Sequence, residues 1–197
     1  MRKELKFPVY FVYLFLISLL IYIIPKGNYE FIGYAVVIGF LFYFLTITDK
    51  LYKYSIFGIW LFAIWVVLHL FGGILYFGGT RLYDIVLINL LGPPYDILKY
   101  DQFVHTYCYF AIAILLYYPL KKYMKVSSKI PLIVFAILSA IGIGLLNEVI
   151  EFGMVIFADA ADAVGGYYNT ALDLVFNLIG AIIGAVFVSR VLDEKNI

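Results

Sequence analysis

Charge is scarce in this sequence, and cysteine is almost absent. Only 14% of the 197 residues are Asp, Glu, Lys or Arg, whereas 65% are hydrophobic. A soluble domain of this size needs a far more charged surface, so the composition excludes that class and predicts an integral membrane protein. Cys108 is the single cysteine, which excludes an intrachain disulfide. The basic residues fall in short loops at helix ends, so nucleic acid is not an expected partner.

Long apolar segments recur along the chain, separated by short polar breaks. A helix of about 20 residues crosses a hydrocarbon core of about 30 Å. The sequence therefore predicts an all-α fold, a six-helix transmembrane bundle that forms a single membrane domain over residues 1–197. The stretch Leu82–Leu91 is too short to cross, which predicts a short interfacial or re-entrant segment between the third and fourth helices. The six predicted helices cover residues 8–24, 30–47, 55–77, 101–120, 131–157 and 170–192.

Lysine and arginine are concentrated on one side of the predicted bundle. With six spans, eleven of the 14 basic residues fall on the side that holds both termini. The positive-inside rule then predicts a multi-pass protein of the cell (plasma) membrane with both termini in the cytoplasm. The outer side carries a net negative charge, which attracts cations or cationic head groups unless it only reflects the topology rule. The eleven inner residues are Arg2, Lys3, Lys6, Lys50, Lys53, Lys121, Lys122, Lys125, Lys129, Arg190 and Lys195.

Polar side chains of four predicted helices fall at one depth, in the outer half of the bilayer. Glu148 and Glu151 are three residues apart in an apolar helix, so they share one face. An ionisable group within a span costs roughly 2.5–3.5 kcal/mol on insertion scales. We therefore infer a polar cavity between the third to sixth helices, reached from the extracytoplasmic side or the outer leaflet. Its candidate residues are His69, Asp101, His105, Asn147, Glu148, Glu151, Asp173 and Asn177.

Most of these residues also have a structural interpretation. His69 alone is more often a packing histidine, and Asp101 is a favoured N-cap of the fourth helix. Thr170 and Asp173 have the spacing of a capping box. Asn177 can join two helices by a hydrogen bond, typically worth about 0.6 kcal/mol in membranes. These alternatives stay open at the level of the sequence.

The pair of glutamates fits a structural role least. Two adjacent buried carboxylates repel each other, so one holds a proton or both share a cation or a histidine. Nearby small residues, by contrast, favour close helix packing rather than chemistry. The glycines concerned are Gly142, Gly144, Gly180 and Gly184.

Taken in order along the chain, the polar motifs resemble those of a known family. Asp101 and His105 form D-x-x-x-H, Glu148 and Glu151 form E-x-x-E, and Asp173 opens a D-x-x-x-N-x-x-G-x-x-x-G run. With this order and spacing, over roughly residues 60–190, the chain is similar to the YjdF-like branch of the VanZ-like membrane proteins. VanZ is associated with resistance to a glycopeptide antibiotic that acts outside the cell, so the resemblance implies an outward-facing site but no established activity. Other matching residues are Leu68, His69, Gly72, Gly73, Tyr83, Asp84, Asn147, Asn169, Asn177, Gly180 and Gly184.

The sequence leaves three functions open. The first is a membrane enzyme that acts on a lipid or lipid-linked head group, with Asp101, His105, Glu148, Glu151 and Asp173 as general acid/base groups. The second is a carrier in which the same groups bind a cation or relay protons. The third is a binding protein that only recognises a lipid or another partner. Oligomeric state is not indicated.

A divalent metal ion is the candidate cofactor of the enzyme hypothesis. Carboxylates suit Mg²⁺ or Mn²⁺, and histidine also admits Zn²⁺ or Fe. The sequence contains no HExxH motif, no Cys/His pair and no Glu-x-x-His of the di-iron bundles. The candidate ligands are Glu148, Glu151, His105 and Asp173, with His69, Asn147, Asn177 and Asp84 as further polar residues that bind or support.

Overall fold

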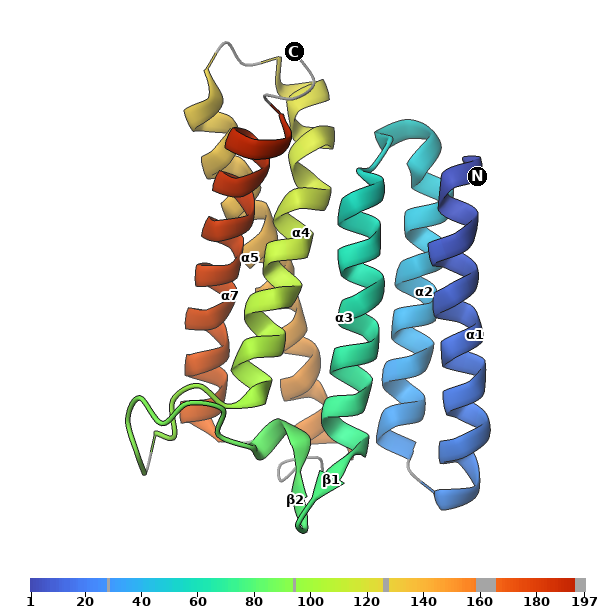
Figure 1. The fold of residues 1–197 in the computed structure, drawn as a ribbon, viewed down its shortest axis with the longest axis vertical. Coiled ribbons are helices and arrows are strands. Elements are labelled where there is room, and N and C mark those ends of the chain that lie inside the picture. The colour runs from blue at the N-terminus through green and yellow to red at the C-terminus, as the bar shows by residue number, and fades with distance from the viewer. Residues whose placement is uncertain (28, 94, 126–127, 159–165, 194–197) are drawn as a thin grey trace.

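Each of the six apolar segments forms one long helix in the computed structural model (Figure 1). The structure describes residues 1–27, 29–93, 95–125, 128–158 and 166–193, and six helices among them are long and apolar enough to cross a membrane. The fold is therefore the all-α six-helix bundle that the sequence predicts. The helices are α1 (Lys6–Ile23), α2 (Tyr29–Tyr52), α3 (Ile56–Ile74), α4 (Tyr100–Met124), α5 (Lys129–Ala158) and α7 (Tyr167–Phe187), which continues as the π-helical turn η4 (Val188–Leu192).

Helices α2 and α4 run beyond their predicted inner ends, where a basic side chain pairs with a buried aspartate. Asp49 of α2 is fully buried, and Arg2 donates to both of its carboxylate oxygens, over 2.8 and 2.5 Å. Lys121 of α4 reaches Asp193, which follows η4. With these partners, neither helix has to stop where its first charged residue appears. Figure 1 shows the N-terminus and the C-terminal end of α7 at this end of the bundle; Lys195 lies outside the described residues.

Among its described residues, the connection between α3 and α4 forms a hairpin, a short 3-10 turn and an irregular loop, and no α-helix. It starts with a short hairpin, in which β1 (Tyr76–Phe77) pairs antiparallel with β2 (Thr80–Arg81). The turn η3 (Leu82–Asp84) and an irregular loop follow. Figure 1 shows this connection across the end of the bundle opposite the termini, which fits the interfacial alternative and not the re-entrant one.

Helix α4 is the centre of the bundle, since it packs against α3, α5 and, most closely, α7. The close approach of α7 depends on Gly180 and Gly184. A Cβ atom at these positions would collide with the backbone carbonyl oxygens of Thr106 and Phe110. The predicted packing role of this GxxxG pair is therefore confirmed, and it brings the polar residues of α4 and α7 together.

The two glycines of α5 differ from each other. A Cβ atom on Gly144 would lie 3.1 Å from Asn177 Nδ2 and 3.2 Å from the ring of Tyr109. A Cβ atom on Gly142 would meet nothing within 4 Å among the described residues. The predicted packing role holds for Gly144, and it is wrong for Gly142 within this part of the chain.

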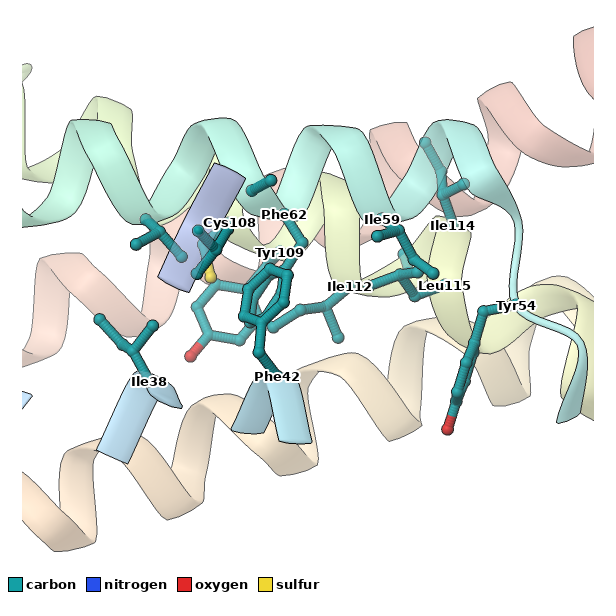
Figure 2. Close-up of a cluster of buried hydrophobic side chains, with 14 of the residues drawn as sticks. Ile38, Phe42, Tyr54, Ile59, Phe62, Cys108, Tyr109, Ile112, Ile114 and Leu115 are labelled. Atoms are coloured by element: carbon teal, nitrogen blue, oxygen red, sulfur yellow. The ribbon is translucent and has the colours of Figure 1, made fainter. Parts of the chain in front are cut away.

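An apolar core joins the N-terminal three helices to α4. Ile38 and Phe42 of α2 lie beside Phe62 of α3 and Ile112 of α4 (Figure 2). The rings of Phe42 and Phe62 stack with centroids 5.4 Å apart. Tyr109, which also belongs to this cluster, marks where the core meets the polar residues.

Candidate functional site

A compact acidic group lies where α4 meets α7. His105 Nε2 is 3.7 Å from Asp101 Oδ1, on the preceding turn of α4, and 4.0 Å from Asp173 Oδ1 of α7. Asp173 is only 1% exposed. One donor atom from each of the three residues lies within 4.8 Å of the other two. We refer to Asp101, His105 and Asp173 as the Asp–His–Asp group.

Two asparagines of α7 hold this group in place. His105 Nδ1 lies 2.9 Å from Asn177 Oδ1, an oxygen that only accepts, so Nδ1 carries the proton of the ring. In the neutral imidazole, Nε2 then directs its lone pair towards the two carboxylates. Asn169 Nδ2 donates to Asp173 Oδ2 over 2.7 Å and to Asp101 Oδ2 over 3.3 Å. The asparagines therefore fix both the ring and the spacing of the acids.

The two glutamates of α5 extend the acidic region beside this group. Asn147 Nδ2 donates to Glu151 Oε1 over 2.8 Å. Glu148 is 8% exposed, and neither of its carboxylate oxygens has a hydrogen-bond partner among the described residues. Both glutamates interact electrostatically with His105. They belong to the same acidic region but not to the compact group.

His69 of α3 is held by aromatic neighbours. Its ring stacks on Trp65 at 5.0 Å and meets Tyr34 edge-on at 5.2 Å. Tyr83 lies in the turn η3. Its hydroxyl is 2.6 Å from His69 Nδ1 and donates to the backbone carbonyl of His69. Burial raises the pKa of Tyr83 well above its ordinary value, so the hydroxyl keeps its proton. The packing interpretation of His69 is supported, and Gly72 makes the room that Tyr83 needs.

A small pocket connects His69 to the acidic region. It has a volume of about 20 Å³ and is lined by residues of α3, α4 and α5, among them His69, His105 and Glu151. This volume is close to that of one water-sized group. The pocket is therefore a small space shared by three helices, with ionisable side chains among a largely apolar lining.

A larger apolar groove adjoins the small pocket. It has a volume of about 370 Å³ and is lined by α2, α3, α4 and α5. On α2 and α5 its lining residues, such as Phe44 and Leu146, are exposed at the surface of the bundle. The groove therefore opens sideways, towards the region that acyl chains occupy. Both cavities are lined by Trp65, Cys108, Tyr109 and Asn147.

Two of the capping interpretations are wrong. The N-terminus of α4 is capped by Gln102, whose side-chain oxygen accepts from the backbone N–H groups of Leu98 and Lys99. The side chain of Asp101 instead lies beside His105. Helix α7 begins at Tyr167, so Asp173 lies too far inside the helix to cap it. Both aspartates are thereby available to the site.

Asp84 lies apart from the acidic region. It forms an exposed ion pair with Arg81, three residues earlier, over 3.0 Å. Asn169 enters the sequence prediction only as a match to the family pattern, without a role, and the aromatic wall of the pocket is not predicted. Asn169 stands four residues before Asp173, and Trp65 four residues before His69, so helical spacing alone places each beside a predicted site residue.

Comparison with known proteins gives a family match. A family model described as a predicted membrane protein matches residues 7–194, nearly the whole chain. No curated protein and no solved structure matches this sequence.

Proposed function

The chain belongs to DUF2238, a family of predicted membrane proteins, and from that premise we propose that it binds an amphiphile of the outer leaflet. The ligand is a lipid or a lipid-linked molecule, with an acyl chain in the apolar groove and its head group next to the acidic region. One observation carries this proposal. The small pocket and the groove share four lining residues, so they adjoin and place acid and imidazole groups beside an apolar groove.

The dimensions of the site suit such a ligand. From His105 to Leu116, α4 rises by about 16 Å, and both residues line the cavities. This length is comparable to the hydrocarbon thickness of one leaflet, which is about 15 Å. An acyl chain in the groove would therefore run from the polar pocket towards the cytoplasmic end, as the chain of an outer-leaflet lipid does.

We include in the proposal a closer relationship of this chain to the YjdF-like branch of the VanZ-like proteins. It supports a site that faces outward, as does the positive charge at the end with both termini. Because the acid and imidazole groups lie at the proposed head-group position, the same binding mode serves an enzyme that acts on the head group.

A cation- or proton-coupled carrier is the alternative. Such a carrier needs polar groups along a path through the bundle. The groove below the polar pocket is lined by apolar side chains, for example Ile112, Leu115 and Leu116. This lining favours an acyl chain over an ion.

The proposal is tested by photo-crosslinking in lipid nanodiscs. A phospholipid with a photoreactive group near the end of its acyl chain should label residues of the groove. Leu116→Trp fills the groove and should lower the labelling about tenfold, which corresponds to a loss of about 1.4 kcal/mol. Ile179→Trp, on the surface of α7, is the matched control and should leave the labelling unchanged.

Two outcomes would contradict the proposal. Equal labelling of wild-type protein and Leu116→Trp would show that the groove does not hold the chain. Proton- or cation-coupled flux in sealed vesicles, abolished by Glu151→Gln, would favour the carrier.

A further inference from the structure

We propose that the Asp–His–Asp group binds a divalent first-row transition metal ion through Asp101 Oδ1, His105 Nε2 and Asp173 Oδ1. This site goes beyond amphiphile binding and does not depend on it. It is formed by α4 and α7, at the contact that Gly180 and Gly184 hold close. Two elements that are far apart in the sequence thus supply the ligands.

The distances between the three donor atoms are close to those of a coordinated ion. Metal–nitrogen and metal–oxygen bonds of about 2.0–2.2 Å place neighbouring donors about 3–3.5 Å apart. In the structure, His105 Nε2 lies 3.7 Å and 4.0 Å from the two carboxylate oxygens. Small side-chain rotations therefore close the set around an ion.

The second observation is a buried oxygen without a partner. Asp173 is 1% exposed, and its Oδ1 has no hydrogen-bond partner among the described residues, although Oδ2 accepts from Asn169. A buried carboxylate oxygen that lacks a hydrogen bond costs about 1–3 kcal/mol, or more when it is charged. Since Oδ1 faces His105 Nε2, a cation between them would satisfy it.

The orientation of His105 is that of a metal ligand. A ligating histidine generally donates its other ring N–H to a carbonyl or carboxylate, which fixes the tautomer. His105 does so through Nδ1 to Asn177 Oδ1. Each of the two aspartates also receives a hydrogen bond from Asn169 on the oxygen that is not offered to the ion.

The donor set indicates the kind of ion. One imidazole with two carboxylates suits Mn²⁺, Fe²⁺ or Zn²⁺ better than Mg²⁺ or Ca²⁺, which prefer oxygen alone. Within the described part of the chain, Asp101 and Asp173 lie within 4.0 Å of His105 Nε2 and form no ion pair with Lys or Arg. A cation therefore also offsets the repulsion between the two acids.

The experiment measures metal binding by protein purified in detergent without a histidine tag. After treatment with a chelator, Mn²⁺ or Zn²⁺ is added back and the bound ion is counted by elemental analysis. We expect one ion per chain. His105→Gln and Asp173→Asn should each lower the affinity by more than about 100-fold, beyond the usual effect of residues that only support a ligand.

The control variant lies on the same outer side of the protein. Asp84→Asn removes a carboxylate from the exposed pair with Arg81 and should bind the ion as the wild type does. His69→Gln serves the spectroscopy alone, because it removes the other histidine. In His69→Gln, His105 is the only histidine left. An imidazole signal in the X-ray absorption spectrum of the bound ion then identifies His105 as the ligand without further variants.

Absence of stoichiometric binding by folded wild-type protein would overturn the proposal. So would an oxygen-only spectrum of the bound ion, or equal affinity in the wild type and Asp173→Asn. If the ligand variants do not fold, the spectrum of His69→Gln, or that of the wild type, decides alone.

Discussion

At the scale of single residues, the site depends on how each polar atom is oriented, and spacing along the sequence predicts this only in part. The i, i+4 pair Asp101 and His105 predicts a shared face of α4, and the structure confirms it. The same spacing does not reveal that Asn169 bridges the two aspartates, because that contact depends on the packing of α7 against α4.

Asn177 is a positioning residue, which gives the first prediction. Asn177→Leu keeps the branched shape of the side chain but removes the oxygen that accepts from His105 Nδ1. We expect metal affinity to fall about 10- to 100-fold, as is typical when the partner of a ligating histidine is lost. Metal titration checks this. Asn147→Leu, which frees Glu151 instead, is the control; an equal loss in both variants would mean that the effect is not specific to His105.

Glu148 gives the second prediction, since both of its oxygens are buried without a partner among the described residues. Glu148→Leu should raise the free energy of unfolding in detergent by about 1–3 kcal/mol, because it removes an unsatisfied buried group. Crosslinking of the amphiphile should fall in the same variant, as stabilising changes at functional sites often reduce function. Glu148→Gln keeps a polar group and should gain less stability. A loss of stability in Glu148→Leu would indicate that the carboxylate has a structural partner.

At the scale of elements, the helices follow from the sequence because apolar runs of this length have few other stable forms in a membrane. The sequence predicts the ends of the helices less accurately. Helices α2 and α4 continue past charged residues that are neutralised by partners distant in the sequence, such as Arg2 for Asp49. The apolar groove could not be predicted from the sequence either, because it lies between α2 and α5, which are far apart along the chain.

The contact between α4 and α7 gives the third prediction. Gly180→Ala places a Cβ atom against the Thr106 carbonyl oxygen, and overpacking of this kind typically costs about 1–3 kcal/mol. Thermal unfolding in detergent should detect the loss, and metal affinity should fall with it because Asp173 moves away from His105. Gly142→Ala meets nothing within 4 Å among the described residues and should be tolerated. Equal stability of the two variants would contradict the proposed packing.

At the scale of the whole molecule, the asymmetry of charge is the clearest signal in the sequence, and it predicts which end of the bundle lies in the cytoplasm. Arg2 and Lys121, two of the residues that carry this signal, pair with Asp49 and Asp193 at the end of the bundle where Figure 1 shows the N-terminus and the C-terminal end of α7. The polar site lies towards the other end, beneath the connection between α3 and α4. The position of the polar site in the bundle and the orientation of the bundle in the membrane together determine from which leaflet the proposed ligand would come.

Topology gives the fourth prediction. Cysteine in place of Thr80, in the hairpin, should react with a membrane-impermeant thiol reagent in intact cells. Cysteine in place of Ser128, between α4 and α5, should react only after the membrane is permeabilised. The native Cys108 is buried and should remain unlabelled in both cases. The opposite labelling pattern would reverse the orientation and place the site in the inner leaflet.

The sideways opening of the groove has a consequence for how occupancy is measured. A ligand that enters from between neighbouring lipids arrives by diffusion within the plane of the bilayer, not from water. Saturation then follows the mole fraction of the ligand in its leaflet. Added empty bilayer would release the ligand even at constant bulk concentration, whereas added buffer would not.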